Sequence, residues 1–147
     1  MLRTRLDLDA KDLADQLAAL PDTQQRAVAL AVVRCAAEQI HLQEPLVDAA
    51  VQMLAQGIYK DERTTDALEK LAESYDVQYL DAHERFEAGQ EDDTAWRELF
   101  RRFVVVTAVR QAFNDDAFEA AAESIYDAGA AIGFDDPRAL LHSIRTD

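Results

Sequence analysis

A formal net charge of −14 over 147 residues repels nucleic acid and anionic membranes, and it favours basic proteins or cations as partners. Hydrophobic residues make up 49% of the chain and charged residues 30%, which is typical of a globular protein rather than a disordered one. Four glycines, three prolines and little strand-type alternation predict an all-α fold. We expect one domain over residues 1–147, a bundle of about six to eight helices.

We expect neither a membrane-spanning segment nor a signal peptide in this sequence. Its uncharged runs fall well short of the roughly 20 apolar residues that span a bilayer, and its start turns acidic too early for a signal peptide. The single cysteine, Cys35, cannot form an internal disulfide and lies in an apolar helical run, as a buried structural thiol does. We expect a cytoplasmic protein.

The first half of the chain predicts an N-terminal arm followed by three helices. Pro21 ends the first helix, and Pro45 opens the third, because proline suits the first turn of a helix. Gly57 fits the left-handed position just after the third helix. The predicted segments are an arm at 1–8 and helices at 9–20, 22–41 and 45–57.

The second half predicts a long helical segment from Thr64 or Thr65 to Ala88, either one helix or two that meet near residues 74–77. After a loop at 89–93, the helix 93–113 begins amphipathic and becomes apolar nearly all round. A helix of that kind is wrapped by others, so we expect it at the centre of the bundle. Its triple valine and its aromatic stripe are expected to be core. Two further helices are predicted, at 117–131 and 136–144.

Motifs for catalysis are absent from the sequence. There is no Gly-x-Ser-x-Gly turn, no phosphate-binding glycine loop and no His-Glu-x-x-His. Glu38 and His41 have the Glu-x-x-His spacing of di-iron bundles, but a second copy is missing. We therefore predict a protein that is not an enzyme and holds no cofactor, with a metal-binding bundle as the least favoured alternative.

Two acidic stripes are the most informative features. Spacings of three and four residues place each set of carboxylates on one helix face, where like charges destabilise the helix by about 0.2–0.5 kcal/mol per pair. Each stripe is either a solvated face or a docking surface for a basic partner, and we take the second interpretation. The candidate partner-binding residues are Glu62, Asp66, Glu69, Glu73 and Asp76 in the first stripe, and Asp116, Glu119, Glu123 and Asp127 in the second.

Arg110 lies inside the apolar arc of the 93–113 helix, between Leu99, Phe103 and Val106. An arginine there must pair with an acid or reach the surface along its stem. It either forms an internal salt bridge to a neighbouring helix or contacts a partner. In the first case the helix is scaffold and function lies on the acidic faces.

In general character, as an acidic all-helical chain, the protein resembles the small immunity proteins of bacterial toxin systems. That resemblance implies an inhibitor that neutralises a basic effector such as a nuclease toxin. We predict a non-catalytic protein-binding module with a basic protein partner and with no nucleic-acid or membrane partner. The alternative is a self-assembling helical scaffold or adaptor, in which copies of the chain form a homo-oligomer.

Overall fold

The computed structural model describes residues 4–5 and 11–132, and the predicted all-α class is confirmed there. Its regular structure in these residues consists of six α-helices connected by short turns. They are α2 (Lys11–Ala18), α3 (Asp22–Gln39), α4 (Pro45–Ala55), α5 (Glu62–Glu87), α6 (Thr94–Gln111) and α7 (Ala117–Ile132).

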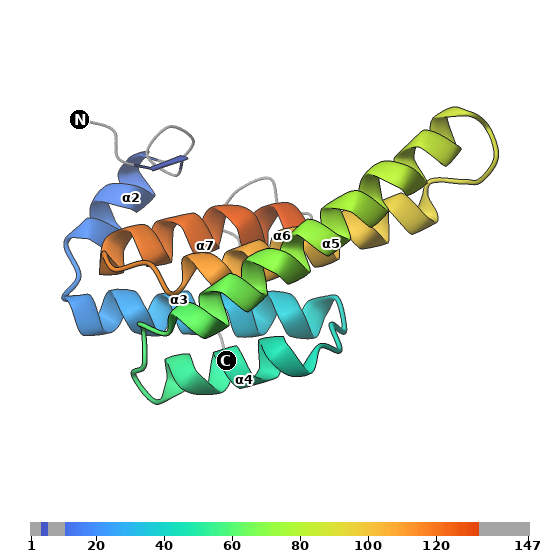
Figure 1. The fold of residues 1–147 in the computed structure, drawn as a ribbon. Helices are drawn as coiled ribbons and strands as arrows, with labels where there is room; N and C mark the ends of the chain where they lie inside the picture. Colours follow the sequence, from blue (N-terminus) through green and yellow to red (C-terminus); the bar gives the residue numbers. More distant parts are fainter. Residues whose placement is uncertain (1–3, 6–10, 133–147) are drawn as a thin grey trace.

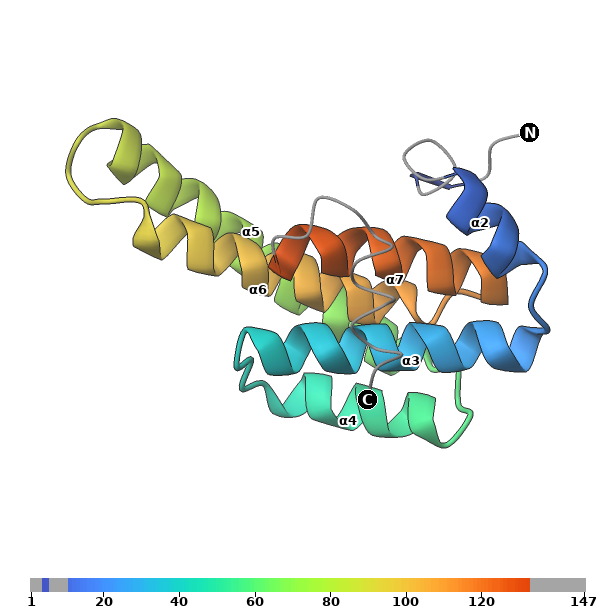
Figure 2. The same cartoon turned by 180° about the vertical axis from the view of Figure 1, so that it is seen from behind.

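Helix α7 packs against both α3 and α6, and α6 in turn packs along α5. Helix α4 lies beneath α3, and α2 sits at the end of the bundle where α3 begins (Figure 1). The antiparallel helices α5 and α6 form a hairpin whose loop end extends beyond the body, as both views show (Figures 1 and 2). The hairpin therefore has an inner half in the bundle and an outer half that projects from it.

The core follows the apolar pattern of the sequence. The valines at 104, 105 and 106 are buried, and so are Ala108 and Val109, so the second half of the 93–113 helix is wrapped by neighbours as predicted. Helix α7 is enclosed on more than one side because alanines and Gly129 allow its neighbours to approach closely. Cys35 is half-buried and packs against this core.

Buried polar side chains connect the helices at defined points. The Gln25 amide donates to the Leu17 carbonyl at 3.0 Å, which ties α3 to α2. The Ser124 hydroxyl donates to the Ala108 carbonyl at 3.2 Å and ties α7 to α6. Each bond satisfies a group that would otherwise cost free energy when buried.

Three helices end in the same way, with a residue in the left-handed conformation just past the helix. Gly57 (φ 80°) and Gly89 (φ 75°) occupy this position after α4 and α5, where the absence of a Cβ removes the steric cost. After α3 the position is held by His41, with φ 53°. The Leu42 amide then donates to the Ala37 carbonyl at 3.0 Å, completing the same capping pattern.

One expectation about the helices is refined, and two others concern residues that the structure does not describe. The long segment from residue 64 to 88 is one continuous helix that begins at Glu62, because Asp61 caps it by accepting a hydrogen bond from the Thr64 amide at 2.9 Å. This bond lowers the pKa of the Asp61 carboxyl. The predicted helix at 136–144 and most of the predicted arm at 1–8 lie outside the described residues.

Candidate docking surface on the long helix

The first acidic stripe runs along one side of α5, where Glu69 still contacts Arg110 of α6. Its members Glu62, Asp66, Glu69 and Glu73 are exposed and Asp76 is half-buried. The same spacing of three or four residues continues through Leu80 to Glu84 and Glu87, with Val77 beside Leu80. We call this surface the α5 ridge, made of Glu62, Asp66, Glu69, Glu73, Asp76, Val77, Leu80, Glu84 and Glu87.

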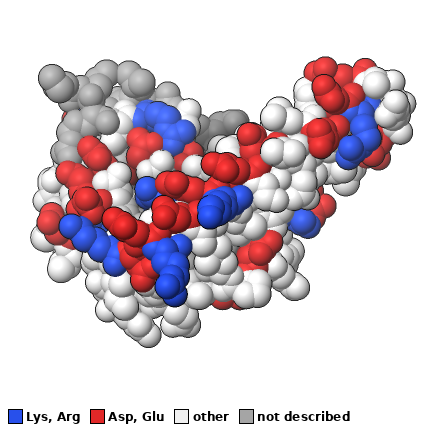
Figure 3. Space-filling model, in the orientation of Figure 1, with Lys and Arg blue, Asp and Glu red and all other residues white. Residues whose placement is uncertain are grey.

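Two aliphatic side chains interrupt the carboxylates of the α5 ridge. Val77 is 59% exposed and Leu80 is 53% exposed, and both lie on the outer half of the hairpin. Figure 3 shows acidic side chains running along α5 from the body toward the tip. Single exposed aliphatic residues are ordinary, but an adjacent pair set among carboxylates on one helix face has the composition of a binding surface.

Most of the ridge's negative charge is not neutralised within the molecule. Glu69 accepts from Arg110, and Glu87 lies 3.3 Å from a ring nitrogen of His83. In residues 4–5 and 11–132, the other five ridge carboxylates form no ion pair: Glu62, Asp66, Glu73, Asp76 and Glu84. Such a surface produces a negative potential that attracts basic partners.

An aromatic cluster between the two hairpin helices fixes the direction in which the ridge faces. The ring centroids of Tyr79 and Phe100 are 5.4 Å apart, and those of His83 and Trp96 are 4.9 Å apart in an edge-on arrangement. Phe86 completes the cluster against Trp96. These rings hold the inner face of α5 against α6, and the carboxylates of the α5 ridge lie beside that face, most of them exposed.

The expectation that the whole aromatic stripe of α6 is core needs correction. Phe100 and Phe103 are half-buried and pack against the edge of the core. Trp96, also half-buried, belongs to the hairpin cluster instead. The reason is that the first half of α6 projects with α5, so only one neighbouring helix covers it.

Arg110 forms an ion pair within the molecule. Its Nε lies 2.9 Å from a carboxylate oxygen of Glu69 on α5. The predicted internal salt bridge of Arg110 to a neighbouring helix is therefore confirmed.

The second acidic stripe does not form an exposed face. Asp116 caps α7 by accepting from the Glu119 amide at 2.9 Å. Glu123 and Asp127 both bind Arg5, at 2.6 and 2.9 Å from its Nη2. Asp127 is buried and Glu123 is largely covered, and the docking role expected for this stripe stays a prediction. Arg5, more than one hundred residues away in the chain, thus balances part of the negative charge of this stripe.

Burial dominates the chemistry of Asp127. Desolvation raises the pKa of this carboxyl to about 6, and it outweighs the attraction of Arg5, while Glu123 adds repulsion. Its Oδ1 accepts from Arg5, and its Oδ2 is buried without a hydrogen-bond partner among the described residues. The arrangement holds the N-terminal Arg5 on α7 at an electrostatic cost.

The sequence pattern missed five residues that bear on the site: Val77, Leu80, Glu84 and Glu87 of the α5 ridge, and Arg5. Leu80 and Glu84 continue the spacing of the first stripe. The run of acids itself ends at Asp76, because the next position in the spacing is Leu80. The register of three and four residues would have found both. Arg5 carries no local signal, because its partners are more than one hundred residues away.

The described residues hold no cluster of three His, Cys, Asp or Glu side chains arranged to bind a metal ion. None of the helices found there has the length and apolar character needed to cross a membrane. The fold and surface thus define an all-α bundle with a projecting, acidic hairpin. No protein-family model matches the chain, and comparisons with curated proteins and with solved structures yield no match.

Proposed function

We propose that the protein is a non-catalytic, cytoplasmic binding module that docks a basic protein through the α5 ridge. The observation that carries the proposal is the exposed pair Val77 and Leu80 set among carboxylates without internal partners. An aliphatic anchor with a charged surround is the arrangement in which buried contacts give affinity and charges give rate and specificity.

The dimensions of α5 fit this role. Its 26 residues make a helix of roughly 39 Å, enough for one side of an interface that covers about 800 Å² per partner. The matching partner surface has lysines or arginines around a shallow apolar patch. An inhibitor that neutralises a basic effector, such as a nuclease toxin, is the form of this function that the charge fits best.

Charge reversal within the ridge tests the proposal. The wild type and the variant Glu73→Lys/Glu84→Lys are immobilised and exposed to lysate of the source organism, and any protein retained by the wild type is purified. Its association rate is then measured at low and physiological salt. We expect a rate for the wild type that falls with salt, and a much lower rate with a weaker salt dependence for the variant.

The matched control reverses an exposed acid outside the ridge, Glu38→Lys on α3. It should leave the association rate close to that of the wild type. Equal rates for the wild type and the ridge variant, or a wild-type rate unaffected by salt, would contradict docking through the α5 ridge.

Self-assembly is the second candidate, and the hairpin gives a specific reason to test it. Residues 77–87 of α5 carry three acids and one arginine, whereas residues 94–103 of α6 carry three arginines and one acid. Two hairpins packed antiparallel would place opposite charges together and cover Leu80. Light scattering at high protein concentration decides: a dimer lost in Leu80→Asp supports self-assembly, and a monomer excludes it.

A further inference from the structure

The first half of α6 forms one wall of a cleft at the base of the projecting hairpin. The cleft has a volume of about 590 Å³, within the range of about 300–1,000 Å³ that small-molecule sites occupy. The end of α3, with Ile40 and His41, and the end of α7, with Ala131 and Ile132, form the other walls. It lies apart from the α5 ridge.

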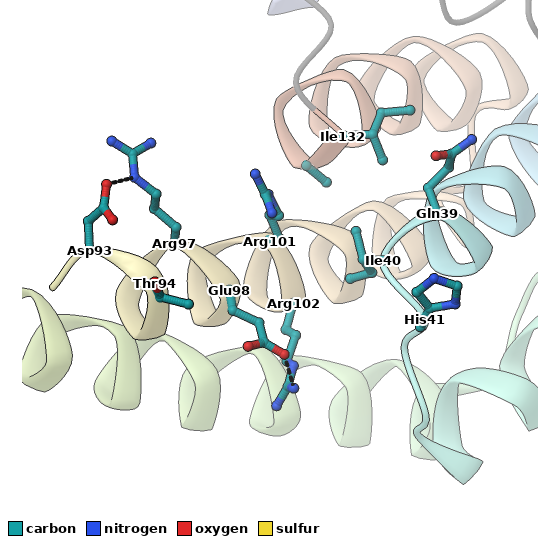
Figure 4. Close-up of a pocket in the computed structure, with 11 residues that line it drawn as sticks. Gln39, Ile40, His41, Asp93, Thr94, Arg97, Glu98, Arg101, Arg102 and Ile132 are labelled. Carbon is teal, nitrogen blue, oxygen red and sulfur yellow. Dashed lines mark hydrogen bonds and ion pairs between the residues drawn. The ribbon is translucent and has the colours of Figure 1, made fainter.

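Arginines dominate the charge of this cleft, although the protein as a whole is strongly acidic. Three arginines and two acids line it, which leaves one net positive charge. Arg102 pairs with Glu98 at 2.5 Å, and both side chains point toward α5 (Figure 4). Arg97 and Arg101 point to the other side of α6, and Arg101 is the one that lies near the end of α7 (Figure 4).

Of Arg97 and Arg101, one is paired with a carboxylate within the described residues and the other is not. Arg97 binds Asp93 at 2.6 Å, whereas Arg101 is exposed and binds no acid in the part of the chain that the structure describes. The two lie one helical turn apart, so their charges repel each other. The planar guanidinium of Arg101 offers a fork of donors that matches the two oxygens of a carboxylate.

Two apolar side chains line the same cleft as Arg101. Ile40 and Ile132 are half-buried members of the cleft wall, and both pack against the core that holds them in place. His41, whose imidazole belongs to the same wall, occupies a left-handed position that glycine normally fills. Strained conformations of this kind gather at functional sites.

We infer that this cleft binds a small organic carboxylate, with the anion on Arg101 and its apolar body against Ile40 and Ile132. A single negative charge balances the single net positive charge of the lining. A doubly charged phosphate ester would meet repulsion from Asp93 and Glu98, so the site selects a carboxylate over a phosphate of similar shape. This inference does not depend on the docking role of the α5 ridge.

The test uses benzoate as the carboxylate probe and phenyl phosphate as its doubly charged counterpart. Trp96 reports on the site, because the Arg97 guanidinium carbon lies 4.8 Å from the centroid of its ring and the chain has no other tryptophan. Titration is followed by Trp96 emission and by calorimetry at constant ionic strength. We expect saturable benzoate binding in the micromolar to millimolar range and weaker binding of phenyl phosphate.

Arg101→Gln should weaken benzoate binding about ten-fold or more, because it removes a charge-assisted bidentate contact. Arg101→Lys keeps the charge but loses the forked pair of donors. Its affinity for benzoate should lie between those of the wild type and Arg101→Gln. The matched control Arg34→Gln removes an exposed arginine elsewhere on the molecule and should bind as the wild type does. Circular dichroism checks that each variant is folded.

Three results would overturn the inference. They are no saturable benzoate binding by calorimetry at millimolar concentration, equal weakening by Arg101→Gln and Arg34→Gln, or tighter binding of phenyl phosphate than of benzoate. The second result would assign any binding to general charge attraction, and the third would assign the cleft to phosphate.

Discussion

The Nη2 atom of Arg5 lies 2.9 Å from Oδ1 of Asp127. Despite this positive neighbour, burial raises the pKa of the Asp127 carboxyl to about 6. The folded protein therefore binds the Asp127 proton more tightly than the unfolded chain, whose Asp pKa is about 4. The tighter proton binding adds to the free energy of unfolding at low pH. This contribution is lost as pH rises from about 4 to about 6, and the free energy of unfolding is level above that range.

Asp127→Asn should remove this dependence. At about pH 7.5 the variant should be more stable than the wild type, by on the order of 2 kcal/mol, because it no longer buries a charge. Near pH 4 the two should converge. Urea denaturation at several pH values measures the difference, with the exposed Asp66→Asn as control. A variant that is less stable at pH 7.5 would show that the Arg5 pair outweighs desolvation.

The Arg110–Glu69 pair should contribute little to stability. Both side chains are well exposed, at 34% and 53%, and exposed ion pairs contribute about 0.2–1 kcal/mol. A double-mutant cycle with Arg110→Gln and Glu69→Gln measures the coupling, and Glu38→Gln combined with Arg110→Gln serves as the distant control. A coupling well above 1 kcal/mol would indicate that the pair is shielded from solvent in solution.

Leu80→Ser should weaken binding of the partner while leaving the stability of the fold nearly unchanged. The side chain is 53% exposed, so its removal should change the free energy of unfolding by less than about 0.5 kcal/mol. As the anchor of the proposed interface, its loss should raise the partner's dissociation rate about ten-fold or more. Ile58→Ser is the matched control, since Ile58 is 39% exposed and lies outside the α5 ridge.

His41→Gly should stabilise the protein by about 0.5–1 kcal/mol, because glycine adopts the left-handed conformation without a steric cost. His41→Ala, which keeps a Cβ, should bring no such gain. Thermal or urea unfolding provides the comparison. A destabilised glycine variant would mean that the imidazole makes contacts worth more than the backbone strain.

The sequence predicted the helices well because their signals are local. Pro45 marked the start of α4 and Gly57 its end, and both positions hold in the structure. The long segment was open between one helix and two, since Ser74 and Val77 are weaker helix formers. Packing of Tyr75 and Tyr79 against neighbouring elements favours the continuous helix; burial and the Glu44 hydrogen bond raise the pKa of Tyr75 to about 12.

The candidate site was only half predictable. The first stripe follows from spacing alone, so its shared face could be read from residues 62–76. The second stripe has equally regular spacing, yet Arg5 binds two of its four carboxylates, and no local rule predicts a contact between residues 122 positions apart. Likewise, Trp96 and Val105 both look like core positions, but only the tertiary structure shows that the hairpin carries Trp96 away from the body.

The projecting outer half of the hairpin has a consequence for the motions of the protein. Its helices are joined by the cluster of Tyr79, His83, Phe86, Trp96 and Phe100, whereas the inner half is also held by α7 and the core. Segments with fewer buried contacts open with lower free energies, independently of global unfolding. Amide hydrogen exchange should therefore slow from the tip at Gly89 toward Val105. Binding of a partner should first slow the exchange of amides at the tip.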